Sequence, residues 1–279
     1  MPKLYVTDLD GTLLRSDATL SPYSRTRLAE MLDQGLQLAI ASARSIVSIQ
    51  MILAGLPIRL PVIELNGAMV SDLATGHHRV IHAVPPHLMA DIYALVTDSG
   101  HVPFISSVDA TRDWLHYAGL HNEGTRWYVA NRTEARDPRL HHTPDLRACF
   151  DQQIVAITLV DRLEPMEQMA AAVAERFGDA LATNFFENGY TPGWFWLTIH
   201  DKRATKDQAV RDLLQLLDVQ PRDLVAFGDH WNDLGMLQLA GTAIAVSNAT
   251  DELKAHATHI IGPNDDDSVA KYILHDWQP

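Results

Sequence analysis

The sequence predicts an α/β protein: a Rossmann-like, doubly wound parallel sheet interrupted by an inserted α+β domain. Short apolar runs alternate with longer segments of helical periodicity at both ends of the chain. That alternation is typical of a parallel sheet covered by helices on both faces. Between them the rhythm changes, and the chain becomes richer in His, Arg, Trp and Asn. We therefore predict one core domain from 1–83 and 196–279, with 84–195 inserted as a second domain.

The first part of the core contains three apolar runs that are too short for helices and two segments with a helical apolar face. Leu28, Met31 and Leu32 share one such face after a Ser-Pro start, and Gly55 closes the next segment. The expected strands are Leu4–Thr7, Leu36–Ala41 and Val62–Leu65, and the expected helices are Ser21–Gln34 and Ser45–Ala54.

The inserted segment is less regular. Amphipathic periodicity predicts helices over Pro86–Ser99 and Glu164–Phe177, and the run IVAITLV predicts a strand over Ile154–Val160. Asp137–Pro144 is expected to be a loop. Four ring-bearing residues fit either the core of this domain or part of a substrate pocket: Trp114, His116, Tyr117 and Trp127.

The α/β alternation resumes after the insertion. The helix expected over Thr205–Leu217 has an apolar stripe that ends in Leu213, Leu214 and Leu217. The other expected helices are Asn232–Ala240, Asp251–Ala257 and Ser268–Asp276, and the expected strands are Leu224–Phe227 and Ala243–Val246. The two flanking parts of the chain are therefore expected to share one sheet.

Charge and composition exclude several classes of protein. The 279 residues include 22 Lys and Arg against 35 Asp and Glu, a formal net charge of −13, which disfavours nucleic acid or an anionic membrane as partner. One cysteine, Cys149, excludes an internal disulfide, and no apolar run approaches the ~18 residues of a membrane helix. Carboxylates within the first ten residues predict no secretion signal. We expect a soluble, cytoplasmic monomer or small homo-oligomer whose partner is a small molecule.

Polar side chains follow three of the predicted strands. Ligands of an open parallel sheet bind beyond the carboxyl ends of its strands. Four acidic residues at these ends would repel one another unless a cation lay among them. Oxygen-only ligands favour a hard ion, and Mg²⁺ is the usual choice. The acidic residues are Asp8, Asp10, Asp229 and Asp233, and the other polar residues at these ends include Ser42, Arg44 and Asn232.

Such a site suits phosphoryl transfer. Either Asp8 or Asp10 could act as a nucleophile that forms an acyl phosphate, and the other could serve as general acid and base. Ser42 at a strand end and Lys206 at a helix start would supply donors and positive charge to the transferring group.

Four motifs in this order resemble those of the haloacid dehalogenase-like phosphatase superfamily. They are DLDGTLL at 8–14, the serine at 42 after an apolar strand, Lys206, and GDHWND at 228–233. The tripeptide Asn66-Gly67-Ala68, the long insertion and the tail with Asn248-Ala249 resemble the Cof-type sugar-phosphatase branch. The resemblance covers the whole predicted core, whereas the insertion agrees only in position and size.

The resemblance assigns roles at matching positions. Asp8 would be the nucleophile and a Mg²⁺ ligand, and Asp10 the general acid and base, with its backbone carbonyl on the metal. The remaining metal site would be Asp229 as a direct ligand and Asp233 as the residue that orients the ligands. The phosphate would be held by Ser42, Lys206 and Asn232, with Gly11 making the tight turn and Thr12 binding through its backbone. Arg44 and Asn66 are candidates for the substrate pocket.

The function expected from this resemblance is a Mg²⁺-dependent phosphatase for small phosphorylated metabolites, sugar phosphates first, with an aspartyl phosphate on Asp8. The insertion would act as a cap that excludes water and sorts substrates. Two alternatives stay open: a sugar phosphomutase that uses the same site, and a non-catalytic protein that binds phosphorylated metabolites.

Two positions depart from the family pattern. Ala43 replaces the usual glycine of the second motif, and its methyl group would crowd the loop if φ there were positive. His230-Trp231 fills a turn that often holds glycine, and the indole is expected to narrow the entrance to the site.

Calcium and zinc motifs fit the sequence less well than a magnesium site. An EF-hand spacing would need Glu where Thr19 stands, and the 14 histidines form no zinc pattern.

Overall fold

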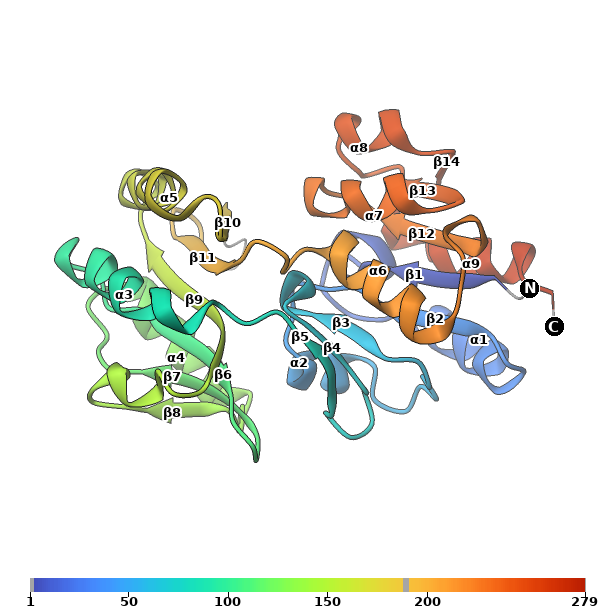
Figure 1. Ribbon diagram of the computed structural model, residues 1–279. Helices are drawn as coiled ribbons and strands as arrows, with labels where there is room; N and C mark the ends of the chain where they lie inside the picture. The colour runs from blue at the N-terminus through green and yellow to red at the C-terminus, as the bar shows by residue number, and fades with distance from the viewer. Residues whose placement is uncertain (1–2, 188–190, 279) are drawn as a thin grey trace. The chain divides into compact units, whose positions relative to one another are not determined.

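The computed structural model describes residues 3–187 and 191–278, which fall into two compact units (Figure 1). The core unit comprises Met1–Ile81 and Arg203–Pro279, and the inserted unit comprises His82–Lys202. The predicted boundary at 195/196 would cut strand β11 (Phe195–Asp201) from its neighbours. Because β11 pairs antiparallel with β9 (Gln153–Asp161) and β10 (Leu181–Glu187), it belongs to the inserted unit.

The core unit is built on a five-stranded sheet in which every neighbouring pair is parallel. Its order is β14-β13-β12-β1-β2. The central strands are buried along their whole length, as their near-continuous apolar sequences predicted. The strands are β1 (Leu4–Thr7), β2 (Gln37–Ile40), β12 (Leu224–Gly228), β13 (Thr242–Val246) and β14 (His259–Ile261).

This strand order fixes the point at which the winding of the sheet reverses. From β1 the chain adds β2 on one side, and after the insertion it adds β12, β13 and β14 on the other side. The direction of winding therefore reverses between β1 and β12, and ligands of open α/β sheets bind at such a switch point. The sequence prediction of a doubly wound parallel sheet is confirmed.

Helices of the core lie close to the ranges expected. The helix α6 begins after Thr205, whose hydroxyl accepts a hydrogen bond from the backbone N–H of Gln208, and its apolar stripe from Ala209 to Leu214 is buried. The helices are α1 (Pro22–Asp33), α2 (Ile46–Ile52), α6 (Lys206–Leu217), α7 (Leu234–Leu239), α8 (Asp251–His256) and α9 (Ser268–Asp276).

The third predicted strand is present beside the end of β2, but it belongs to a separate three-stranded sheet. The strand β3 (Val62–Glu64) runs parallel to the residues that follow β2, where Ala41 and Ile63 form a bridge and the N–H of Ser42 donates to the carbonyl of Ile63 at 2.9 Å. It pairs antiparallel with β4 (Met69–Ser71), which in turn pairs with β5 (His78–Ile81). The cause is the short connection at 65–68, which reverses the chain through the left-handed residues Leu65, Asn66 and Gly67.

The inserted unit is a six-stranded sheet of order β10-β11-β9-β6-β7-β8 with helices on both faces. Alternate residues of a strand point to opposite faces, and β11 shows the consequence. Leu197 and Ile199 pack in the cluster that contains α3 (Met89–Asp98) and α5 (Leu163–Phe177), whereas Trp196 packs against α4 (Glu123–Glu134). The remaining strands are β6 (Phe104–Val108), β7 (Asp113–Tyr117) and β8 (Leu140–His142).

The sequence prediction of the inserted unit was incomplete, since the strands β6, β7, β8, β10 and β11 and the helix α4 were not predicted. The expected loop 137–144 contains β8, a three-residue edge strand that pairs parallel with β7 and is too short and polar to show a period. The helix α4 is polar over most of its surface, so it lacked an apolar stripe. Of the aromatic group, Tyr117 and Trp127 pack against Phe104 and Trp196, which favours a core role.

Cys149 is buried, its thiol contacts the carbonyl of Leu146, and burial raises its pKa to about 11. Within residues 3–187 and 191–278, no helix combines the length and apolarity that crossing a membrane would require.

Candidate active site

Asp8 follows the last residue of β1, at the switch point of the sheet. Its backbone N–H donates to the carbonyl of Phe227 on β12, which fixes the two strand ends side by side. The residue is only 6% exposed. Its Oδ1 accepts a hydrogen bond of 2.6 Å from the Nζ of Lys206. A carboxylate held this firmly at a strand end is presented in one orientation.

Lys206 is almost completely buried, although a lysine at the first position of a helix is normally solvated. Its ammonium group donates to Asp8 Oδ1 at 2.6 Å and to Asp233 Oδ1 at 2.7 Å. Burial by itself lowers the pKa of Lys206, but Asp233 and Asp8 together outweigh that effect and raise it. Lys206 therefore remains a cation at any physiological pH.

Asp233 uses both carboxylate oxygens. Oδ1 binds Lys206, and Oδ2 accepts the backbone N–H groups of Asp229 and His230 at 3.0 and 3.2 Å. The glycine before this loop is required, because a Cβ on Gly228 would lie 2.5 Å from that of Asp233. Asp233 therefore sets the path of the loop that carries Asp229, and it joins that loop to the lysine.

Three acidic side chains meet at this point. Ligand oxygens of Asp8, Asp229 and Asp233 lie within 4.8 Å of one another. Burial raises the pKa of Asp8 well above its ordinary value; Lys206 opposes the shift, and Asp233 and Asp229 add to it. Burial and the neighbouring Asp233 raise the pKa of Asp229 to about 6, against the hydrogen bond from Thr12. Both shifts reflect excess negative charge in a poorly solvated place.

These residues fit a divalent cation. Three carboxylates against one ammonium leave two negative charges uncompensated in the fully ionised site. All the ligand atoms are oxygens, which hard ions such as Mg²⁺ prefer. A bound cation of this charge would return the carboxyl groups to their ionised forms. The arrangement can therefore hold a metal beside a nucleophilic carboxylate.

Asp10 lies apart from this acidic group. Its carboxylate pairs with the guanidinium of Arg44, which donates from Nε to Oδ2 at 2.7 Å and from Nη2 to Oδ1 at 2.6 Å. Nearly half of the Asp10 side chain is exposed. From the motif alone, Asp8 and Asp10 were equivalent candidates for the nucleophile. The structure separates their carboxyl groups and pairs that of Asp10 with Arg44.

The turn after β1 is shaped by Gly11 and Thr12. Gly11 has a φ of +75°, and a Cβ there would lie 2.4 Å from Asp229 Oδ2, so only glycine fits. The hydroxyl of Thr12 donates to Asp229 Oδ1 at 3.0 Å. Asn248 ties the turn down, since its Nδ2 donates to the carbonyl of Gly11 at 2.7 Å. The side chain of Thr12 thus orients the carboxylate of Asp229.

Ser42, Asn66 and Asn232 form a second connected group. The buried Ser42 accepts the Arg44 backbone N–H on its Oγ and the Asn66 backbone N–H on its carbonyl. Asn66 Oδ1 then accepts from Asn232 Nδ2 at 3.0 Å. The second motif, the 65–68 turn and the fourth motif are therefore linked by direct hydrogen bonds.

The structure accommodates both departures from the family pattern, Ala43 and His230-Trp231. Ala43 has a negative φ, so its methyl group is accommodated without strain. Trp231 is 47% exposed, at the start of the turn before Asp233, and His230 contributes its backbone N–H to that carboxylate. Neither position displaces a reacting group.

Sequence reasoning missed a set of supporting residues. Glu64 is fully buried and accepts the backbone N–H of Ile46 at 2.6 Å and the hydroxyl of Ser71 at 2.7 Å, so it anchors the start of α2 next to the second motif. Gly67 approaches α6 so closely that a Cβ would lie 2.2 Å from the carbonyl oxygen of Thr205. The supporting role of Glu64 could have been predicted from a glutamate in an otherwise apolar strand. That of Gly67 could have been predicted from the Asn-Gly turn signal at 66–67.

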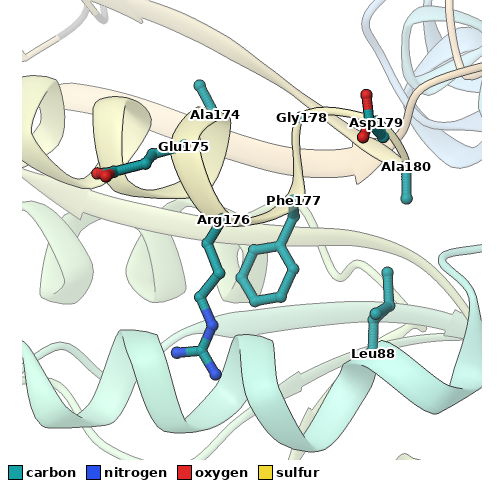
Figure 2. A pocket seen from close by; sticks show the side chains of 8 residues that line it. All are labelled: Leu88, Ala174, Glu175, Arg176, Phe177, Gly178, Asp179 and Ala180. Carbon is teal, nitrogen blue, oxygen red and sulfur yellow. The ribbon is translucent and has the colours of Figure 1, made fainter.

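A hollow of about 460 Å³ lies in the inserted unit, at the end of α5 (Figure 2). Arg176 and Phe177 project from the helix end in the same direction, whereas Glu175 points away from them. The lining comprises Leu88 and residues 174–180, none of which is a predicted catalytic residue. The candidate active-site residues described above all belong to the core unit.

Three carboxylates, two of them bridged by a buried lysine, at the switch point of a parallel sheet mark this chain as an α/β protein with an aspartate-rich candidate site. The chain belongs to the haloacid dehalogenase-like hydrolase family, whose sequence model matches residues 5–273. The family predicted from the motifs is confirmed.

Relatives of known name match almost the whole chain. Pyridoxal phosphate phosphatase YbhA of Escherichia coli is 28% identical, with 97% of each chain covered. The 5-amino-6-(5-phospho-D-ribitylamino)uracil phosphatase YwtE of Bacillus subtilis is 26% identical, with 97% of this chain and 96% of that protein covered. A crystal structure from Thermotoga maritima, 25% identical, gives a TM-score of 0.82 and covers 100% and 99% of the two chains.

The contact between Gly67 and Thr205 generates a prediction. Gly67→Ala must displace the start of α6, because the new methyl group meets backbone, so Lys206 shifts and kcat falls at least ~10-fold. Gly35→Ala is a matched control, since Gly35 has nearly the same φ (+101° against +102°) but no atom within 4 Å of a new Cβ. Both variants bear a backbone strain of about 1–2 kcal/mol. Thermal melting measures the loss of stability common to both, and kcat measures the loss of activity expected in Gly67→Ala alone. Equal kcat in the two variants would contradict the account.

Proposed function

We propose that the protein is a Mg²⁺-dependent phosphatase that releases phosphate from small phosphorylated metabolites through a covalent aspartyl phosphate on Asp8. One observation carries the proposal: the buried Asp8 carboxylate lies at the switch point, with Lys206 on one oxygen and two further carboxylates beside it. The phosphatase names of the relatives support the same class of reaction.

In the first step a carboxylate oxygen of Asp8 attacks the phosphorus atom, and the bond from phosphorus to the ester oxygen breaks. The leaving oxygen takes a proton from the Asp10 carboxyl group. In the second step Asp10 accepts a proton from water, whose oxygen attacks the phosphorus of the acyl phosphate. Inorganic phosphate leaves and the Asp8 carboxylate is restored.

The transferring phosphoryl group needs donors and positive charge around its oxygens. Lys206 supplies a permanent cation, and its place at the first turn of α6 adds the field of the helix N-terminus. Ser42, Asn232 and the backbone N–H groups of Gly11 and Thr12 complete the proposed phosphate site. The hydrogen bond from Arg44 to Ser42 Oγ leaves the serine hydroxyl hydrogen available as a donor.

Asp8 and Asp229 would hold Mg²⁺ through their carboxylates, with the backbone carbonyl of Asp10 as a third ligand and Asp233 orienting the site. When bound, the ion neutralises charge on the phosphate and on the carboxylates. The Arg44–Asp10 pair fixes the position of the Asp10 carboxyl group, which acts as the general acid once the pair has opened and the carboxylate carries a proton from solvent. Arg44 is therefore proposed as a positioning residue for Asp10.

The substrate class proposed is a small phosphate monoester, with sugar phosphates first. Two relatives are named for phosphates of other small molecules, pyridoxal and a ribitylaminouracil. The inserted unit, His82–Lys202, is proposed to sort substrates as a cap. A phosphate-release screen over sugar phosphates, nucleotides and pyridoxal phosphate identifies the substrate, and an isomerised ester in place of free phosphate would assign a phosphomutase instead.

Asp8→Asn is expected to lower kcat for an aryl phosphate at least ~10³-fold, because the amide cannot form the acyl phosphate. The fold is expected to survive, since asparagine has the same shape and Lys206 keeps its bond to Asp233. Asp33→Asn, at an exposed position of α1, is the matched control and keeps full activity. Substantial turnover by a correctly folded Asp8→Asn protein would refute the mechanism.

Removal of divalent ions with EDTA is expected to abolish phosphate release, and Mg²⁺ is expected to restore it. Asp229→Asn removes one proposed ligand, so the Mg²⁺ concentration for half-maximal activity should rise ~10-fold or more. Activity is measured across a Mg²⁺ titration of the stripped protein. Unchanged turnover in chelator would exclude the proposed metal dependence.

A further inference from the structure

A second group of side chains of the types that bind metals lies in the inserted unit, outside every sequence motif. It consists of His101, His121 and Asp161, which we call the His–His–Asp cluster. One ligand atom from each lies within 4.8 Å of the others. His101 Nδ1 is 3.4 Å from Asp161 Oδ2, and the two imidazole rings have their centroids 6.2 Å apart. Their spacing in the sequence, 20 and 40 residues, matches no zinc motif.

Three elements of the inserted unit, labelled in Figure 1, bring these residues together. Asp161 is the last residue of β9, His101 follows α3, and His121 precedes the N-cap of α4. The cap residue Asn122 fixes this arrangement, because its Nδ2 donates to the carbonyl of Val160 at 2.8 Å while its Oδ1 accepts the Thr125 N–H. The start of α4 is therefore tied to the end of β9, one residue from Asp161.

The turn that carries His101 is also fixed. The N–H of His101 donates to the carbonyl of Val96 on α3 at 3.2 Å, and Gly100 before it adopts a φ of +81°. Phe104, three residues later, pairs with Thr158 on β9. The backbone around all three ligand candidates is thus held by regular structure, which gives a preorganised site.

The donor set suits an ion softer than Mg²⁺. Two imidazoles and one carboxylate are ligands that zinc accepts, with the fourth position left for water. At zinc–ligand distances of ~2.0–2.2 Å, ligand atoms around one tetrahedral ion lie about 3.3 Å apart. The separation of 3.4 Å between His101 Nδ1 and Asp161 Oδ2 already has this value.

Charge and access also favour an ion. Asp161 Oδ1 accepts the backbone N–H of Arg162, while Oδ2 faces His101. The guanidinium of Arg162 is engaged elsewhere, on the carbonyl of Gly193 and over the ring of Trp194. His101 is buried, whereas His121 is exposed and gives an ion a path from solvent.

We propose that the His–His–Asp cluster binds one divalent transition-metal ion, with Zn²⁺ as its probe, and that this ion crosslinks α3, β9 and α4 of the inserted unit. The site is independent of the proposed phosphatase chemistry, because its ligands all lie in the inserted unit and the carboxylate site lies in the core unit. The core site offers oxygen ligands only, so the two ions differ in type as well as in place.

The test is calorimetric titration of chelator-stripped protein with Zn²⁺ in excess Mg²⁺, which occupies the core site. The unaltered chain is expected to bind one Zn²⁺ that Mg²⁺ does not displace, and to melt at a higher temperature with it. His121→Gln should weaken this binding at least ~10-fold. His87→Gln, at an exposed histidine of the same unit, should leave it unchanged.

Two further controls accompany this titration. Circular dichroism of the stripped variants checks that His121→Gln folds, as its exposure predicts. Asp229→Asn should retain the Zn²⁺ site, since it alters only the core unit. Equal Zn²⁺ affinity in His121→Gln and the unaltered chain, or loss of Zn²⁺ binding in Asp229→Asn, would overturn the proposal.

Discussion

The buried ion pair network of Lys206 with Asp8 and Asp233 is the interaction on which the rest of the site depends. It joins the end of β1, the start of α6 and the loop after β12 through bonds of 2.6 and 2.7 Å. Burying charged groups costs several kcal/mol per ion unless good geometry compensates for it. The protein places these charges at the carboxyl ends of β1 and β12, the switch point at which open α/β sheets bind ligands.

This network also constrains how the chain is arranged. The lysine comes from the first residue after the cap of α6, and α6 is the first helix after the chain returns from the inserted unit. Gly67 lets the 65–68 turn touch Thr205, and Gly11 and Gly228 make room for Asp229 and Asp233. Glycine is used at these positions because the carboxylates and the helix start approach the backbone too closely for any other residue.

The sequence was informative where one physical signal dominated. Buried strands such as β1 and β12 are continuous apolar runs with polar residues at their ends, so the parallel sheet and three of the four acidic residues expected at one place could be predicted. Asp10, expected to join them, pairs with Arg44 instead. The order of motifs then identified the family. The pairing of β3 with β4 was not predicted, because an apolar run does not reveal its partner and the left-handed turn after β3 sets this pairing.

Other features depend on contacts that no local pattern encodes. The motif DLDG does not show that Asp8 turns to Lys206 while Asp10 turns to Arg44. The polar helix α4 and the three-residue strand β8 have no hydrophobic periodicity in their sequences. They are stabilised by the neighbouring strands and by the apolar cluster around Phe104 and Trp196. The His–His–Asp cluster was invisible for the same reason, since only the tertiary fold brings its three members together.

The central claim is that Asp8, and not Asp10, carries the phosphoryl group, and covalent trapping tests it most directly. The protein is mixed with an aryl phosphate, quenched during turnover and reduced with borohydride, which converts an acyl phosphate to an alcohol. Tryptic cleavage releases the peptide Leu4–Arg15, which contains both aspartates, and fragmentation in a mass spectrometer locates the change. Our account predicts reduction at Asp8 alone. Reduction at Asp10, or an unmodified peptide throughout the turnover time course, would contradict it.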